Sequence, residues 1–409
     1  MESYIVEWLG LLGRWLHFVA GVAWVGASFY FVWLDNHLQA PKENRDRDKG
    51  VAGELWAVHG GGFYHSQRYA LTPPVLPETL HWFKWEAYTT WLSGVFLLAL
   101  IYWYGAEVYL IDPRVADLGK PAAIGIGIAS LVLGWVAYDL LCRSPAGNNE
   151  KLLAACVFAF SAATAWGLCQ VFSGRGAFIH YGAMLGTIMV ANVAHVIIPG
   201  QRELVAAAKE GRDPDPVYGE RGKQRSVHNT YFTLPVLFVM ISNHYAMTYA
   251  HEYNWLILIA LSLAGALIRV YFVARHRGGA SLVPAGLAAA IIAAVAVLVA
   301  PSPSSSTTGT DASINMDDVQ RIVTERCTTC HAETPVQPGF AAAPAGLLLD
   351  NRDQIIANAE QIYQQTVVSK AMPIANLTNM TDQERQILAR WYEGAAGESA
   401  SSDTPARDR

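Results

Sequence analysis

The sequence has few charged residues and few cysteines. Only 15% of its 409 residues are charged, and 29 lysines and arginines against 34 aspartates and glutamates give a formal net charge of −5. This balance offers no basic face for nucleic acid. Of the five cysteines, Cys142, Cys156 and Cys169 fall inside long apolar runs, where a buried and unreactive thiol is the usual role. No structural disulfide is expected.

Apolar residues make up 52% of the chain and gather in long runs. A helix needs about 20 predominantly apolar residues to cross a bilayer. The sequence predicts eight such helices within residues 1–300: Trp8 to Leu34, Trp85 to Leu110, Ala122 to Cys142, Leu152 to Phe172, Ala177 to Ile198, Thr230 to Ala250, Trp255 to Arg275 and Leu282 to Ala300. The first run lacks a basic leader and a small-residue cleavage site before Asp35, so a span is expected there, not a cleaved signal peptide.

The most specific motif is Cys327-Thr328-Thr329-Cys330-His331. Two thiols at this spacing followed by a histidine form the attachment signature of a covalent c-type haem, with His331 as the proximal iron ligand. A redox or zinc-binding Cys-x-x-Cys would instead need a thioredoxin-like strand or a second ligand pair, and the sequence offers neither. The motif predicts one haem c, attached through Cys327 and Cys330.

A second iron ligand is expected further along the same segment, and Met372 in Lys370-Ala371-Met372-Pro373 is the candidate. A thioether ligand raises the reduction potential of a haem. Met380 competes, although it stands just before a capping box at Thr381 to Glu384, where a packing role is the alternative. Residues 317–395 are predicted to form a small class I-type cytochrome c domain, after a flexible linker at 301–316 and before a disordered tail at 396–409.

The fold class is therefore expected to be all-α, an eight-helix integral membrane bundle followed by the cytochrome c domain. Haem c is attached on the outer side of a bacterial inner membrane, so an even number of spans places both termini in the periplasm. Charge agrees, because the loops expected outside carry only Arg114, Lys120 and Arg175, while those expected inside carry Lys42, Arg45, Arg47, Lys49, Arg68, Lys84, Arg143, Lys151, Arg202, Lys209, Arg212, Arg221, Lys223, Arg225 and Arg277.

Polar residues inside the predicted spans are costly and point to function. His17, His180 and His244 are expected in the outer half of the membrane, where they could hold a b-type haem between helices. The alternative is that each imidazole hydrogen-bonds a neighbouring helix. Asp139 and Gln170 are further polar residues, with a proton path or helix packing as the two explanations.

The inner loop between the first two predicted spans gathers polar and aromatic groups in the run Val58 to Tyr69. Its three glycines let backbone N–H groups approach a ligand, and Gln67 and Arg68 can give paired hydrogen bonds to a polar planar molecule. An aromatic-rich loop lying on lipid headgroups is the alternative.

Several sequence segments together resemble those of one protein family. They are the run from Glu54 to Gly94, the segment Phe178 to Met189, and Ser226-Val227-His228-Asn229 leading to Ile241-Ser242-Asn243-His244-Tyr245. With a C-terminal cytochrome c, they look like the bacterial membrane-bound urate oxidases, and the resemblance covers nearly the whole chain. It implies oxidation of urate to 5-hydroxyisourate on the cytoplasmic side, with electrons passed to the fused haem and not directly to oxygen. Span five of the family often has an aromatic residue at the position of His195, which is therefore discounted as a haem ligand.

With this resemblance, the predicted substrate site lies at the inner face between the first loop and the loop before span six. His65 and His228 are the candidate general bases, and Gln67 and Arg68 the candidate substrate-binding residues. A soluble cytochrome c or a terminal oxidase is the expected final acceptor. Two other functions stay open from the residues alone: a quinol-oxidising or relay cytochrome subunit, and a haem or copper transporter that carries a redox domain.

Overall fold

The computed structural model of the chain describes residues 2–70, 72–276, 279, 281–300, 314–337, 340 and 342–402. The first part is built from long helices with short ones between them. Their bounds are α1 (Glu2–His37), α2 (Asn44–Asp48), α3 (Trp85–Leu97) with a π-helical continuation (Leu98–Trp103), α4 (Ala106–Tyr109), α5 (Lys120–Arg143), α6 (Glu150–Cys169), α7 (Gly174–Asn192) with a π-helical continuation (Val193–Ile197), α8 (Ile198–Glu210), α9 (Pro216–Ser242), α10 (Ala246–Tyr249), α11 (Asn254–His276) and α12 (Val283–Leu298).

Every predicted apolar run falls largely within these helices. Among the described residues, five helices are long and apolar enough to cross a membrane: Tyr4–His37, Lys120–Arg143, Glu150–Cys169, Gly174–Glu210 and Asn254–His276. The other three runs differ for physical reasons: the Trp85 helix passes into a π-helical turn, α9 begins with polar residues, and α12 is short. The count of eight spans stays a prediction.

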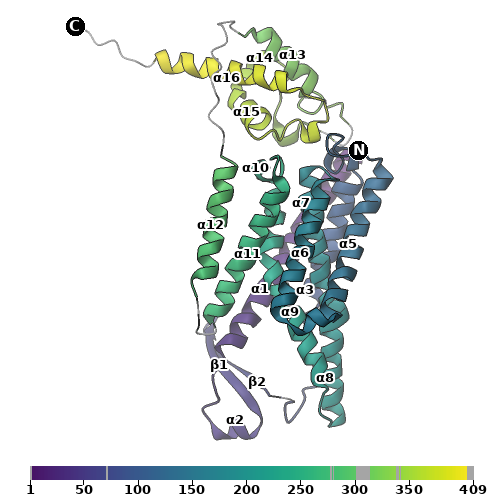
Figure 1. Cartoon of the computed structure of the whole chain (residues 1–409), viewed down its shortest axis with the longest axis vertical. Coiled ribbons are helices and arrows are strands. Elements are labelled where there is room, and N and C mark those ends of the chain that lie inside the picture. The colour runs from purple at the N-terminus through teal and green to yellow at the C-terminus, as the bar shows by residue number, and fades with distance from the viewer. Residues whose placement is uncertain are drawn as a thin grey trace, which may run out of the picture.

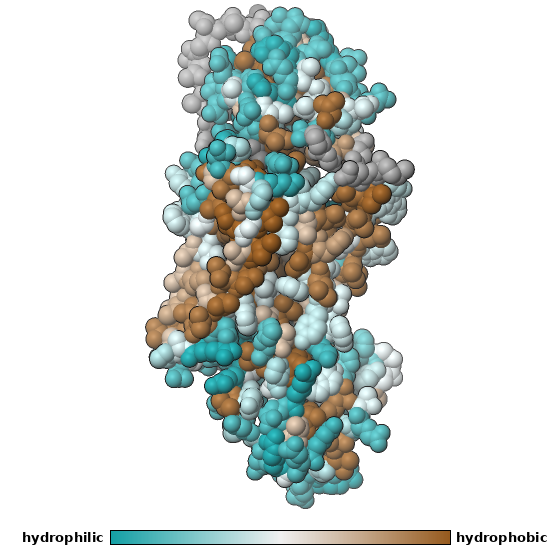
Figure 2. Space-filling model, turned by 90° about the vertical axis from the view of Figure 1, so that its right-hand side faces the viewer, coloured by the Kyte–Doolittle hydropathy of each residue, from teal (hydrophilic) through white to brown (hydrophobic). Residues whose placement is uncertain are grey.

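The two ends of the helix bundle carry different parts of the chain. The N-terminus and the C-terminal domain lie at one end, and the strands β1 and β2 with α8 lie at the other (Figure 1). Hydrophobic residues dominate the middle of the face in Figure 2, and hydrophilic residues cover both ends. The hairpin and the C-terminal domain therefore lie at opposite ends of the bundle, and their placement on opposite sides of a membrane stays a prediction.

The all-α prediction is corrected by one β-hairpin. Of the described residues, 71% are helical and 5% are in strands, and β1 (Val51–His59) pairs antiparallel with β2 (Gly62–Tyr69). The run expected as a flexible glycine loop is a tight turn, because Gly60 and Gly61 take positive φ values of 57° and 80°. Two consecutive positive φ values are typical of the type I′ hairpin turn, which favours glycine.

Helix α7 lies at the centre of the bundle and contacts α5, α6 and α9. Two glycines allow this close packing: a Cβ at Gly134 would lie 2.4 Å from Met184 Cγ, and one at Gly182 would lie 2.5 Å from Val239 Cγ1. Small residues at helix contacts let backbones approach in a membrane bundle. As a result, the polar side chains of α5, α7 and α9 meet in a buried interior.

The C-terminal domain consists of α13 (Met316–Arg326), α14 (Arg352–Ala357), α15 (Ala359–Tyr363), a π-helical turn (Gln364–Val368) and α16 (Asp382–Ser402). Val319, Ile322, Val323, Ile355 and Leu388 are buried in its core. Most of the predicted linker, residues 301–313, lies outside the described residues, as do residues 403–409 of the expected tail. Helix α16 runs beyond residue 395, where the domain was expected to end, so part of the expected tail is helical.

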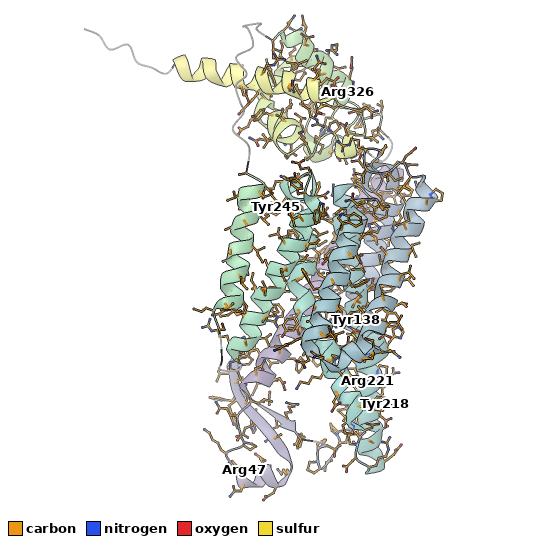
Figure 3. The ribbon with its side chains drawn as sticks, viewed as in Figure 1. Arg47, Tyr138, Tyr218, Arg221, Tyr245 and Arg326 are labelled. Atoms are coloured by element: carbon orange, nitrogen blue, oxygen red, sulfur yellow. The ribbon has the colours of Figure 1, made fainter. Side chains whose placement is uncertain are left out.

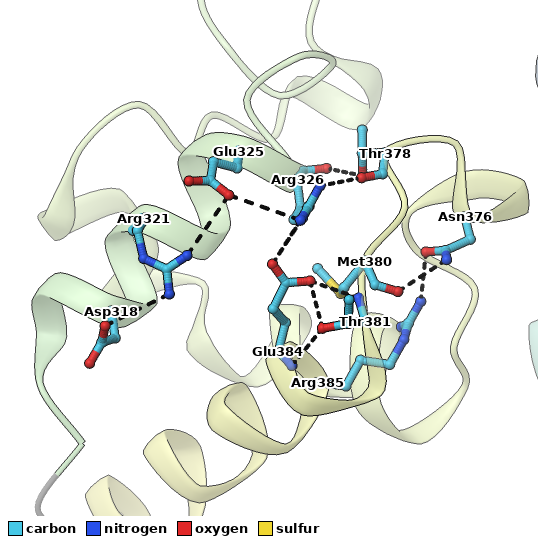
Figure 4. Close-up of polar contacts among 10 residues, drawn as sticks. All are labelled: Asp318, Arg321, Glu325, Arg326, Asn376, Thr378, Met380, Thr381, Glu384 and Arg385. Carbon is cyan, nitrogen blue, oxygen red and sulfur yellow. Dashed lines mark hydrogen bonds and ion pairs between the residues drawn. The ribbon is translucent and has the colours of Figure 1, made fainter.

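Figure 4 shows what fixes the start of α16. The backbone N–H of Thr381 donates to Glu384 Oε2 (2.7 Å), and the Thr381 hydroxyl accepts from the Glu384 N–H (3.2 Å). This confirms the predicted capping box. Glu384 Oε1 also pairs with Arg326 of α13 (3.0 Å), so the box links the first and last helices of the domain.

Candidate functional site

The C-terminal domain contains a pocket lined by Cys327, Cys330, His331 and Met372. These are the four residues that the sequence assigned to haem c. About 520 Å³ of empty space, part of it open to solvent, lies between these side chains. Its other lining residues are Val108, Arg326, Phe340, Pro344, Pro373, Ile374, Leu377 and Thr378, which are mostly apolar.

The tautomer and protonation state of His331 fit those of an iron ligand. Its Nδ1 lies 3.1 Å from the carbonyl oxygen of Leu347, and a carbonyl can only accept, so Nδ1 carries the proton. Such an outer hydrogen bond fixes the tautomer and leaves the Nε2 lone pair for a metal. Burial lowers the pKa of His331, which favours this neutral form. The residues present therefore suit proximal ligation.

The two thiols do not resemble a redox or zinc pair. Burial raises the pKa of Cys327 to about 12 and also raises that of Cys330, whereas reactive Cys-x-x-Cys thiols have a depressed pKa. Within the described part of the chain, no three His, Cys, Asp or Glu side chains are grouped to hold a metal ion. The raised pKa values are not those of a reactive redox pair, and covalent haem attachment stays the prediction made from the motif.

The two methionines have different surroundings. Met372 lines the pocket, and its carbonyl accepts from Arg385 Nη1 (2.8 Å). Met380 is only 3% exposed and packs in the core among Val323, Ile355 and Leu388. The arrangement supports Met372 as the axial candidate, and the ligation itself stays a prediction.

Redox titration of the c-type absorption band separates the two methionines. Met372→His should lower the midpoint potential by on the order of 100 mV, because replacing a thioether by an imidazole removes the ligand that raises it. The matched variant Met380→Leu conserves volume in the core and should leave the potential unchanged. A large shift in Met380→Leu, with none in Met372→His, would assign the ligand to Met380 instead.

The pocket of the C-terminal domain is also lined by a residue of the preceding helical part. Val108 of α4 lines it together with the C-terminal residues. Behind it, the ring of Tyr109 lies 6.2 Å from that of Tyr102, which lies 6.1 Å from the His180 ring. Arg175 Nε and the Tyr102 hydroxyl both donate to Asn243 Oδ1 (3.0 and 3.2 Å). A polar and aromatic cluster therefore lies directly beneath the pocket.

The histidines proposed for a b-type haem are either hydrogen-bonded within the protein or exposed. His180 is fully buried, with Nδ1 2.8 Å from the Gly176 carbonyl and Nε2 accepting from Trp103 Nε1 (3.2 Å). His17 Nδ1 lies 2.9 Å from the Thr90 carbonyl and 3.0 Å from Ser93 Oγ. His244 is exposed. His180 thus has no free ring nitrogen in this arrangement, which corresponds to the packing alternative for that residue.

A buried polar network occupies the opposite half of the bundle, near Tyr138 (Figure 3). The Tyr138 hydroxyl lies 2.7 Å from His228 Nδ1 and accepts from Asn192 Nδ2 (3.1 Å). Arg225 donates to Asn192 Oδ1 (3.3 Å) and to Asp139 Oδ1 (2.7 Å). Tyr138, Asn192, Arg225 and Asp139 are all less than a tenth exposed. His228 was a sequence candidate, and Asp139 was noted as a costly polar residue.

Two residues of this network, Arg225 and Asn192, were not among those predicted from the sequence. Arg225, His228 and Asn229 follow a spacing of three and four residues, so they share a face of α9. That spacing could have drawn attention to Arg225, which was counted only as a loop charge. Nothing local to Asn192 indicates that it bonds both Tyr138 and Asn229.

The hairpin residues lie apart from this network. His65 Nε2 pairs with Glu54 Oε2 (3.0 Å), and its ring stacks on Trp56 at 4.1 Å. Gln67 stands opposite Glu54 in the sheet, and Arg68 pairs with Asp35 (2.8 Å) in an exposed contact. The predicted set of His65, Gln67, Arg68 and His228 therefore divides into two locations, because the expected loop is a hairpin whose side chains find local partners.

Residues 3–300 match the model of the family described as urate oxidase N-terminal. The match covers more than half of the chain, so the chain belongs to this family. Membership indicates an oxidoreductase with a urate oxidase-related function. No curated protein and no solved structure matches the chain.

Proposed function

We propose that this member of the urate oxidase N-terminal family oxidises urate to 5-hydroxyisourate and passes the electrons to a haem c in its own C-terminal domain. One observation carries the proposal: a single chain joins the family's region, residues 3–300, to a pocket lined by Cys327, Cys330, His331 and Met372. If the protein instead passed the electrons from urate directly to oxygen, this pocket would have no role.

The reaction balances without oxygen. Urate and one water give 5-hydroxyisourate, two protons and two electrons. A haem c held by Cys327, Cys330, His331 and Met372 would accept one electron at a time, so two transfers would complete each turnover. The protein must therefore bind an anionic purine, accept protons and hold the haem pocket within reach of the substrate domain.

The membrane location is part of the same proposal. Five described helices are long and apolar enough to span a bilayer, and the apolar middle zone in Figure 2 supports a bilayer around them. We place residues 314–402 in the periplasm, where haem c is attached, and the hairpin with α8 in the cytoplasm, where purine breakdown supplies urate. The protein is then a multi-pass protein of a bacterial inner membrane, with a cytochrome c or a terminal oxidase as the next acceptor.

For proton transfer, His228 is the stronger of the two histidine candidates. It is held by Tyr138 in a buried network that also contains Arg225 and Asn192, and a positioned imidazole is the commonest general base. His65 is already paired with Glu54 on the hairpin. The aromatic cluster of Tyr109, Tyr102 and His180 offers a route toward the pocket, and a b-type haem near His17 or His244 remains the second option.

An anaerobic difference spectrum of membranes containing the protein tests the function. Urate should reduce a c-type band, and a b-type band would be visible in the same trace. His228→Gln should slow this reduction by about 100-fold or more, the usual contribution of a general base. His65→Gln should slow it much less, and the opposite result would make His65 the base. Reduction by a quinol and not by urate would contradict the proposal and favour a respiratory relay.

A further inference from the structure

Arg269 of α11 is a buried cation with unused hydrogen-bond donors. The residue is 6% exposed and lies within the apolar helix Asn254–His276. In the described part of the chain, neither its Nε nor its Nη2 has a hydrogen-bond partner. A buried polar group is normally paired, and an ionisable group inside a membrane helix is costly. Such an orphan therefore points to a missing ligand.

The surroundings of Arg269 define what would fit. The Phe29 ring of α1 lies 3.8 Å from the guanidinium carbon and so covers one face of the group. Tyr231 of α9 is near enough to interact with it electrostatically. Helices α1, α9 and α11 are mutual neighbours in the bundle (Figure 1). The cation–π contact stabilises the charge from its face and leaves the donors along its edge unused.

The two orphaned donors lie on the same edge of the guanidinium. By covalent geometry, Nε and Nη2 point in parallel and form a fork that binds two adjacent acceptors. A planar anion with a carbonyl oxygen beside a deprotonated ring nitrogen offers that acceptor pair. The monoanion of a purine such as urate has this edge.

The other candidate arginines have their charges matched. Arg225 is bound to Asp139 and Asn192, and Arg68 is paired with Asp35 on the exposed hairpin. A substrate anion at either residue would have to displace a carboxylate. At Arg269 it would meet two donors, Nε and Nη2, that have no acceptor among the described residues, so its binding also removes the cost of leaving them unpaired.

We propose that Arg269 binds the anionic edge of the purine substrate at the junction of α1, α9 and α11, in the role that the sequence gave to Arg68. This inference rests on the proposed function, because it assigns the substrate-binding cation of that same activity. Arg269 acts here as a binding residue and takes no part in electron transfer.

Equilibrium dialysis of radiolabelled urate against the full-length, dithionite-reduced holoprotein tests the inference, because a reduced haem accepts no electrons and urate then binds without turnover. Arg269→Gln should weaken binding by about 30-fold or more, as expected for the loss of one partner of a buried charge pair. Arg269→Lys, which keeps the charge without the fork, should fall between. Arg275→Gln removes an exposed arginine from the last turn of the same helix and should bind urate normally.

Thermal unfolding gives a second readout that a merely structural role would not move. Urate should raise the melting temperature of the wild type and of Arg275→Gln by mass action, and have no such effect on Arg269→Gln. Without urate, Arg269→Gln should melt close to the wild type, since the loss of the Phe29 cation–π contact is offset by removal of a buried charge whose Nε and Nη2 are unpaired.

Three outcomes would overturn the inference. The first is unchanged urate affinity in Arg269→Gln. The second is a loss of affinity in Arg68→Gln instead, which would restore the sequence assignment. The third is a fall in lipid phosphorus bound to purified Arg269→Gln with unchanged urate affinity, which would identify a phospholipid headgroup as the ligand. If the wild type neither binds urate nor is reduced by it, the proposed function itself fails, which is a different result from failure at Arg269 alone.

Discussion

In the variant Cys330→Ala, urate should no longer reduce any c-type band, and this is the largest effect that the structure predicts. Cys330 lines the C-terminal pocket beside Cys327 and His331, and loss of one thiol removes one of the two covalent bonds expected to the porphyrin. The anaerobic difference spectrum measures the effect directly. Equilibrium dialysis should show that urate still binds, because the proposed substrate site lies in the membrane domain.

The matched control is Cys156→Ala. Cys156 is a partly buried thiol of α6 and does not line the pocket. Its variant should retain both the c-type band and the response to urate. If Cys330→Ala kept a normal urate-dependent reduction, the electrons would have to leave by another route, and the proposed role of the C-terminal domain would be wrong.

The second large effect concerns stability. Asp139→Ala should lower the free energy of unfolding by about 3–5 kcal/mol, because it leaves the charge of Arg225 buried without its carboxylate partner. The Arg225 side chain is 4% exposed, and the two groups are 2.7 Å apart. Chemical unfolding of the substrate-free protein in detergent measures the loss.

Arg143→Gln provides the comparison, since Arg143 pairs with the same carboxylate at 2.6 Å but has a side chain that is 65% exposed. An exposed pair contributes at most about 1 kcal/mol. The double variant Asp139→Ala, Arg225→Met should recover part of the stability, because it removes the stranded charge. If Asp139→Ala and Arg143→Gln lowered the free energy of unfolding equally, the burial of Arg225 would not be the reason for the loss of stability.

The sequence predicted the helices well because their signal is local. Each apolar run is continuous along the chain, and every one falls largely in helix. The hairpin was missed because its strands carry scattered aromatics, such as Trp56 and Phe63, without a clear alternation of buried and exposed positions. Glu54 and His65 became partners only through the strand register.

The sequence by itself determined the haem motif, the capping box at Thr381 and the apolar character of residues 1–300, because each depends on residue types at short, fixed spacings. Only the tertiary structure decided which polar groups meet. Asp139 and Arg225 are 86 positions apart, and Phe29 lies against Arg269 across a contact between the first helix and α11. Such pairings depend on how helices pack and rotate against one another, and no local spacing encodes that.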